Sequence, residues 1–204
     1  LEIVYDDEFM VVINKPAEFL SVPGINVKDS VYERIKMKYI EATGPLIVHR
    51  LDMPTSGLLV LAKSKESHKI LQSQFIKRTV TKKYIALLDG VLSENSGEIN
   101  LPIRVDLDDR PRQLVCEKYG KNARTKYEVI EIKDNKTKVY FYPITGRTHQ
   151  LRVHSSHHLG LNTPIVGDDL YGKSDRRLHL HAAYLELNHP VTNQRMVFEA
   201  TCDF

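Results

Sequence analysis

The sequence predicts an α+β fold built on a mixed, mainly antiparallel sheet with few helices. Short runs rich in Val, Ile, Tyr and Phe, each bounded by turn residues, outnumber the helical patterns throughout the chain. Residues 123–142 form the clearest hairpin pattern, and no repeat or low-complexity segment interrupts the series. With 204 residues we expect a single domain spanning 1–204, large enough for a cleft between two lobes.

The first half predicts two short strands and two helices around a central strand. The acidic turn Asp6-Asp7-Glu8 separates strands at 3–5 and 9–14. Asp29 or Ser30 caps a helix to about Glu41, with Gly44-Pro45 as its stop signal. A strand at 58–62 precedes a helix at 64–77 whose Leu71 and Phe75 lie one turn apart and face inward.

The second half is richer in strands. The expected strands are 82–90 with a turn at its end, 97–103, 113–117, the hairpin pair 123–133 and 137–142 across residues 134–136, and the final pair 178–187 and 196–200. Thr145-Gly146 turns the chain. A helix from Thr148 then places Thr148, Leu151 and Arg152 on one side.

Charge is unevenly distributed along a chain whose net charge is only +3. Residues 1–33 hold seven acids against two lysines, whereas residues 63–83 hold seven basic residues against one acid. A second basic stretch covers residues 104–126. This segregation fits a one-sided phosphate-binding surface, and ordinary solvated helix faces are the alternative.

Several classes of protein are disfavoured. The two cysteines lie far apart, which indicates reduced thiols in an intracellular protein. Neither a signal peptide nor an apolar run of about 18 residues is present, so we expect a soluble, cytoplasmic protein with no membrane partner. Because the chain begins with Leu1, it is either processed or excised from a longer chain.

Cofactor motifs are also missing. His154, His157 and His158 lie close together, yet no H-E-x-x-H or cysteine set accompanies them, so we expect no metal. No glycine-rich phosphate loop occurs, and His49, Asp52 and Ser56 are too crowded in one loop for a hydrolytic triad.

The most unusual segment is the Asp52 loop, residues 48–57, which lies between the apolar runs 46–48 and 58–62. Pro54 restricts the backbone and Gly57 permits a turn that a side chain would obstruct. In extended backbone Arg50 and Asp52 point to the same face, where a guanidinium stabilises an ionised carboxylate. Thr55 can hydrogen-bond the loop or the acid. A surface turn with an ordinary ion pair is the alternative interpretation.

This loop resembles the H-R-L-D-x-x-T-S-G signature of the RluA family of RNA pseudouridine synthases. The resemblance implies that Asp52 is the catalytic aspartate, that Arg50 helps to expel the target uridine from its stack, and that His49 and Thr55 belong to the substrate-binding loop. Two further segments agree with the family. Lys82, Tyr84, Ala86 and Gly90 match the reduced pattern K-x-Y-x-A-x-x-x-G, which implies that Tyr84 lies against the target base.

The third matching segment begins at Thr145 and is similar to the family's T-G-R-x-H-Q-x-R-x-H. It implies that Arg152 pairs with the catalytic aspartate and that Leu151 lies beside the base. Gly146, Arg147 and His149 would complete this substrate-binding segment. A basic surface helix is the alternative interpretation of the same residues. An arginine partner keeps a carboxylate ionised more firmly than a lysine would.

The resemblance implies a pseudouridine synthase catalytic fold with a central RNA-binding cleft, a ribosomal or transfer RNA substrate, no cofactor and a monomeric enzyme. Asp52 could attack the sugar or remove a sugar proton, and the sequence does not choose between these routes. A non-catalytic RNA-binding or ribosome-assembly factor and a nucleoside hydrolase are the rival functions. The chain departs from the common family pattern at Glu18-Phe19, often Gly-Leu, and in a longer connection at 155–172 that retains Gly167-Asp168.

Overall fold

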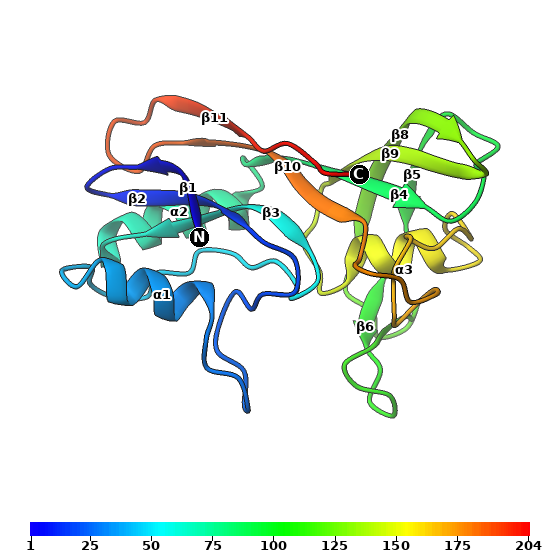
Figure 1. Cartoon of the computed structure of the whole chain (residues 1–204), viewed down its shortest axis with the longest axis horizontal. Coiled ribbons are helices and arrows are strands. Elements are labelled where there is room, and N and C mark those ends of the chain that lie inside the picture. The colour runs from blue at the N-terminus through cyan, green and yellow to red at the C-terminus, as the bar shows by residue number, and fades with distance from the viewer. The chain divides into compact units, whose positions relative to one another are not determined.

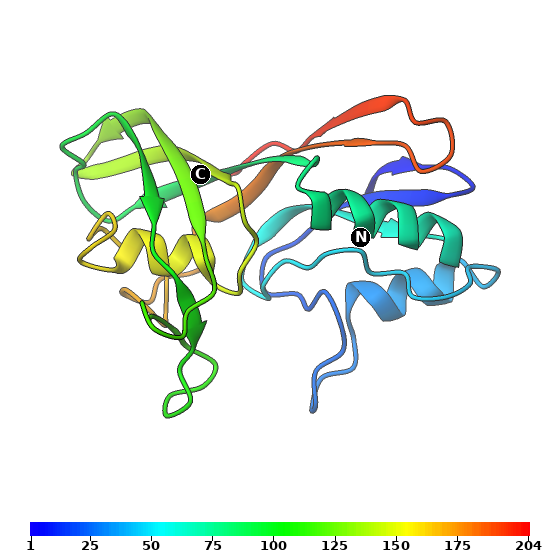
Figure 2. The same cartoon turned by 180° about the vertical axis from the view of Figure 1, so that it is seen from behind.

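A computed structural model describes all 204 residues and divides them into two compact units. The first unit comprises Leu1–Lys82 and Ala182–Cys202, and the second comprises Lys83–His181 and Asp203–Phe204. Strands predominate in both units (Figures 1 and 2), which agrees with the predicted α+β class. None of the helices has the length and apolar character needed to cross a membrane.

The first unit contains a sheet and two helices. β1 (Glu2–Asp6), β2 (Met10–Lys15) and β3 (Ser56–Ala62) lie side by side. β10 (Leu180–Asn188) follows β3 and pairs with β11 (Arg195–Glu199). All seven residues of β3 are buried, so its apolar run is the centre of this unit's core.

Both helices of the first unit are capped by a serine. Of the two caps that the sequence allowed for the first helix, Asp29 or Ser30, the structure has Ser30, and the second helix follows Ser64, where its start was expected. The Ser30 side chain accepts a hydrogen bond from the Glu33 amide at the start of α1 (Val31–Lys38). The Ser64 side chain accepts one from the Ser67 amide at the start of α2 (Lys65–Lys77). These bonds satisfy amides that have no partner within the helix.

The prediction that α1 extends to about Glu41 is wrong, because the helix ends at Lys38. Tyr39 leaves helical geometry at φ −114° and ψ 75°. Its hydroxyl donates to the Asp6 carboxylate at 2.6 Å, and its ring lies 3.9 Å from the Lys63 ammonium. These tertiary contacts compete with one more helical turn. Within α2, Leu71 is fully buried and Phe75 packs against the same core, as predicted.

The second unit contains a four-stranded antiparallel sheet in the order β4-β9-β8-β5. Its strands are β4 (Thr81–Leu88), β5 (Ser96–Asn100), β8 (Arg124–Lys133) and β9 (Lys136–Pro143). β6 (Ile103–Val105) and β7 (Gln113–Val115) form a separate two-stranded sheet. The short helix α3 (Gln150–Ser156) contributes Leu151 to the apolar core of the large sheet.

Several boundaries in the second unit differ from the prediction. The expected strand 97–103 ends as β5 at Asn100, with Ile103 already in β6, and two other differences have a local cause. Asp134 and Asn135 both have positive φ, so the β8–β9 hairpin closes with two residues and Lys136 already pairs with Lys133. α3 begins at Gln150 rather than at Thr148, because His149 adopts the left-handed conformation with φ 53°. Thr148 therefore does not share a helix face with Leu151 and Arg152.

Candidate active site

The Asp52 loop lies between two anchored ends in the first unit. Ile47 pairs with Leu61 as an isolated bridge, and the loop runs from there into β3. Asp52 is half-buried, while Thr55 and Ser56 beyond it are buried. The Asp52 carbonyl accepts a hydrogen bond from the Thr55 amide at 3.1 Å. This bond closes a tight turn around the predicted catalytic residue.

Both neighbours of Asp52 are held by buried polar side chains. The Ser21 hydroxyl donates to the Leu51 carbonyl at 2.7 Å and accepts from the Leu51 amide at 3.2 Å. The Lys15 ammonium donates to the Met53 carbonyl at 3.0 Å, which also accepts from the Phe19 amide. Ser21 is 3% exposed and Lys15 is not exposed at all. The backbone on each side of Asp52 is therefore fixed by groups that water does not reach.

Lys15 is an unusual lysine, because a fully buried ammonium is rare without partners. Besides the Met53 carbonyl, it donates to the carbonyls of Pro16 and Phe19 at 2.9 and 2.7 Å. Three oxygen acceptors match the three donors of an ammonium group. Lys15 thereby ties the end of β2 to the Asp52 loop.

His49 begins the loop as a packed, neutral side chain. Its Nε2 accepts a hydrogen bond from the Val60 amide at 3.1 Å, and its ring stacks on Phe75 of α2 with centroids 4.4 Å apart. Burial, and then the charge of Lys82, lower its pKa to about 3. An acceptor nitrogen and a low pKa both describe an uncharged imidazole, which holds the loop against β3 and α2.

The remaining loop residues occupy different environments. Arg50 is exposed, whereas Thr55 is 2% exposed. Gly57 has φ +113°, and a Cβ atom there would lie 2.3 Å from the Ala182 carbonyl oxygen. The expectation that a side chain at this position would obstruct the turn agrees with this close approach.

The second unit places Tyr84 on β4, opposite Phe141 of β9. Its partly buried ring packs against the apolar core that includes Ala86 and Leu151. The predicted neighbours Tyr84 and Leu151 therefore belong to one apolar cluster. A flat aromatic wall of this kind suits a planar base.

The turn before α3 is organised by Gln150. Its side-chain oxygen accepts from the Thr145 hydroxyl at 2.7 Å and from the Arg147 amide at 3.0 Å, across the exposed Gly146. Its amide group donates to Thr125 and to the Arg124 carbonyl. The Thr145–Arg147 segment is thus held to β8 by one buried glutamine.

Arg152 is 2% exposed and binds two carboxylates. Its Nε and one terminal nitrogen donate to the two oxygens of Asp168 at 2.9 and 2.6 Å, and the same terminal nitrogen donates to Asp169 at 3.0 Å. Asp168 is itself fully buried and accepts from the amides of Leu170 and Tyr171. The guanidinium plane is therefore fixed from within the second unit.

Sequence reasoning assigned no role to Asp168, Asp169 or Tyr171. The Tyr171 hydroxyl lies 2.7 Å from His149 Nδ1 and accepts from the Gln113 amide, while its ring lies 5.3 Å from the Arg152 guanidinium. The retained Gly167-Asp168 pair was the available signal. Asp168 lies sixteen residues after Arg152, in a connection whose structure the sequence did not predict, so the two residues could not be recognised as partners.

The structure thus assembles the predicted residues as two groups. The first unit carries His49, Arg50, Asp52 and Thr55 on one loop. The second carries Tyr84 on β4, Gly146, Arg147 and His149 before α3, and Leu151 and Arg152 in α3. The pairing of Asp52 with Arg152 would join the two groups and stays a prediction.

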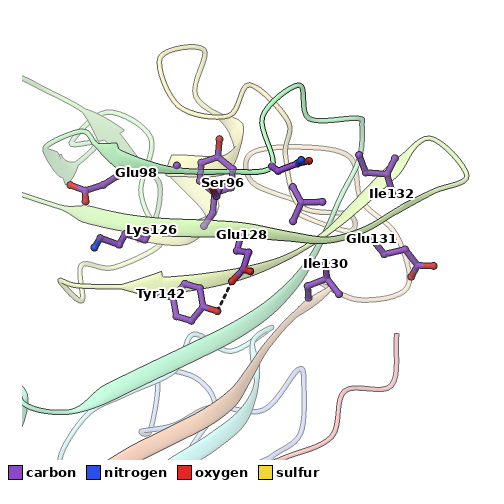
Figure 3. A pocket seen from close by; sticks show the side chains of 12 residues that line it. Ser96, Glu98, Lys126, Glu128, Ile130, Glu131, Ile132 and Tyr142 are labelled. Carbon is purple, nitrogen blue, oxygen red and sulfur yellow. Dashed lines mark hydrogen bonds between the residues drawn. The ribbon is translucent and has the colours of Figure 1, made fainter.

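A hollow of about 960 Å³ lies on the second unit, over β5, β8 and β9 (Figure 3). Glu98, Lys126, Glu128 and Tyr142 line it, with Tyr142 donating to Glu128 at 3.1 Å. None of the predicted site residues lines this hollow.

His154 belongs to the histidine cluster that was considered as a metal site. Its two ring nitrogens contact the Thr125 hydroxyl and the Leu101 carbonyl. No group of three or more His, Cys, Asp or Glu residues that could hold a metal ion is found.

Comparison with known proteins agrees with this arrangement of motifs. Residues 9–157 match the RNA pseudouridylate synthase family. The chain is 46% identical to a dual-specificity RNA pseudouridine synthase RluA of Haemophilus ducreyi and 44% identical to that of Escherichia coli K12, over the whole chain and 94% of each relative.

Solved structures show the same similarity. The human RNA pseudouridylate synthase domain containing 1 is 30% identical with a TM-score of 0.83, over the whole chain and 84% of that protein. The human RNA pseudouridylate synthase domain containing 4 is 28% identical with a TM-score of 0.79, over 98% of this chain and 88% of that protein. The chain therefore belongs to the RNA pseudouridylate synthase family, whose enzymes isomerise uridine in RNA.

Proposed function

We propose that this RNA pseudouridine synthase uses Asp52 as its catalytic residue, with Tyr84 against the target base and Arg152 as the partner of the Asp52 carboxylate. The observation that carries the proposal is the rigid support of Asp52. Its two neighbours are fixed by Ser21 and Lys15, while its own side chain remains half-buried and accessible. A carboxylate held in this way reacts without first losing conformational freedom.

The reaction needs one carboxylate and no external reductant or energy source. The bond between uracil N1 and ribose C1′ breaks, the base turns, and C5 forms a bond to C1′. The C5 proton is lost and N1 gains a proton, so the product is an isomer. Asp52 acts on the sugar either as a nucleophile at C1′ or as a base that removes a sugar proton.

Arg152 suits the role of a charge partner because its orientation does not depend on the substrate. Asp168 holds two of its donors in a buried, two-pronged contact. A hydrogen bond from the same guanidinium to Asp52 would favour the ionised form of the catalytic carboxylate. The proposed catalytic residues therefore have separate supports, one in each unit.

The substrate is a structured RNA from which the target uridine is flipped out, at a cost of a few kcal/mol. We assign Arg50 to the vacated space and His49, Thr55, Gly146, Arg147, His149 and Leu151 to the substrate-binding surroundings. The dual-specificity relatives support two target classes. From the resemblance of the motifs we propose that these are a large-subunit ribosomal uridine and a transfer RNA anticodon stem-loop uridine. We further propose a monomeric, single-domain, cytoplasmic enzyme that needs no cofactor.

The test is Asp52→Asn, assayed on cellular RNA by chemical mapping of pseudouridine and primer extension. We expect product to be abolished while RNA binding persists within about two-fold, because asparagine is isosteric but neither nucleophilic nor basic. Asp89→Asn, at an exposed site on the second unit, is the matched control and keeps full activity. Wild-type turnover by Asp52→Asn would remove Asp52 from the mechanism, and free uracil as product would indicate a hydrolase.

The Asp52–Arg152 pairing is tested by a double-mutant cycle on the free energy of unfolding with Asp52→Asn, Arg152→Lys and the combined variant. If the two groups interact, the loss of stability in the double variant differs from the sum of the two single losses by at least about 0.5 kcal/mol. Additive losses would contradict the pairing. Tyr84→Phe keeps the aromatic wall, so we expect RNA binding to persist.

A further inference from the structure

Ser21 is a buried serine with an unusual pattern of bonds to a distant segment. Its hydroxyl makes two hydrogen bonds to the same residue, donating to the Leu51 carbonyl and accepting from the Leu51 amide, thirty residues away. The side chain is 3% exposed, so water does not replace either bond. A serine that needed only a partner for its hydroxyl would be satisfied by one of them.

The backbone around Ser21 is fixed to a helix. The Ser21 carbonyl accepts from the Tyr32 amide at 3.1 Å, and the Leu20 carbonyl accepts from the Val31 amide at 2.8 Å. Both amides belong to the first turn of α1, whose Val31 and Ile35 are buried. A continuous series of bonds thus leads from α1 through Ser21 to Leu51.

We propose that Ser21 is a positioning residue that sets the orientation of the Asp52 side chain. The inference rests on the proposed catalytic role of Asp52. The Leu51 carbonyl is part of the peptide group that joins Leu51 to Asp52, so the bond from Ser21 restricts rotation of that group about its flanking bonds. The direction of the Asp52 side chain follows from this rotation.

Lys15 does not duplicate this restraint. It holds the Met53 carbonyl, which lies in the peptide group after Met53, on the far side of Asp52. The Asp52 carbonyl is held by the Thr55 amide. The Ser21 side chain therefore restrains the peptide group between Leu51 and Asp52, which Lys15 and Thr55 do not contact in these bonds. A displacement of a catalytic group by about 1 Å lowers a rate by roughly 100-fold.

The test compares Ser21→Ala with Ser30→Ala. Both serines are buried in the first unit, and each accepts a hydrogen bond from a backbone amide. The amide is that of Leu51 for Ser21 but that of Glu33, in the first turn of α1, for Ser30. We expect Ser21→Ala to lower kcat by about 10- to 100-fold while KM and the RNA Kd change less than two-fold. Ser30→Ala should keep kcat within two-fold although its melting temperature falls.

A third variant, Ser21→Cys, retains the shape of the side chain with a weaker donor, and its kcat should lie between those of wild type and Ser21→Ala. Equal kcat for Ser21→Ala and Ser30→Ala at matched folded fraction would overturn the proposal. So would a loss confined to KM. Asp52→Asn measured in parallel separates the two hypotheses, because activity in that variant would refute the role of Asp52 itself, not only its positioning.

Discussion

The contact between Arg152 and Asp168 predicts a large and specific loss of stability in Asp168→Asn. The two side chains are 2% and 0% exposed and share two hydrogen bonds of 2.9 and 2.6 Å. Asparagine retains one oxygen for the amides of Leu170 and Tyr171 but brings an NH₂ group towards a guanidinium. The substitution therefore removes the charge partner while the shape is kept.

Removing one partner of a buried ion pair costs about 3–5 kcal/mol. For a chain of this size each kcal/mol lowers the melting temperature by roughly 2–4 °C, so Asp168→Asn should melt about 6–20 °C below wild type. Asp169→Asn is the matched control. It removes another carboxylate from the same guanidinium, but that side chain is 66% exposed and its loss should cost under about 1 kcal/mol.

Wild type, Asp168→Asn and Asp169→Asn are compared in one buffer by thermal unfolding, followed by circular dichroism. Urea unfolding is the second measurement. Melting of Asp168→Asn within about 2 °C of Asp169→Asn would refute the reasoning. The buried two-pronged contact would then contribute no more than an exposed one.

Three further predictions concern the Asp52 loop. Lys15→Met leaves three carbonyls without their ammonium donor and should destabilise the protein by about 2–4 kcal/mol, measured by urea unfolding; a change below about 1 kcal/mol would contradict the anchoring role. Burial lowers the pKa of His49 to about 3 from an ordinary value near 6.5. The contribution of neutral His49 to the free energy of unfolding is therefore complete above about pH 6.5. It is lost as pH falls towards 3, at up to about 1.4 kcal/mol per pH unit. Wild type should therefore lose more stability between pH 7 and 5 than His49→Gln, and parallel losses would disprove this. Gly57→Ala should cost more than about 3 kcal/mol, whereas Gly24→Ala, whose nearest atoms lie at 3.5 Å, should cost under about 1; similar melting temperatures would refute the close approach.

The parts of the fold that depend on local interactions were predictable. Ser30 and Ser64 cap their helices, and the β8–β9 hairpin carries its own turn residues. Each signal lies within a few residues of the structure it determines. The end of α1 was not predictable, because Tyr39 is drawn away by Asp6, which is thirty-three positions earlier.

The same distinction holds for the site. Three motifs predict the catalytic and substrate-binding groups, but nothing local marks the residues that support them. Lys15 and Ser21 resemble ordinary strand-end and turn residues in the sequence, and their burial arises only when the segment meets the Asp52 loop. The start of α3 was misplaced for a similar reason, because His149 adopts positive φ next to Tyr171.

The three acceptors that Lys15 binds are main-chain oxygens, and this limits which substitutions can detach the Asp52 loop. Because the ammonium contacts peptide carbonyls, exchanging the side chain of Phe19 or Met53 leaves each acceptor atom in the chain, whereas exchanging Lys15 removes the donor to all three. Glu18, between two of these acceptors, has φ 56°, a conformation that glycine adopts with the least strain. The anchoring of the loop therefore depends on one side chain and on the path of the backbone around it.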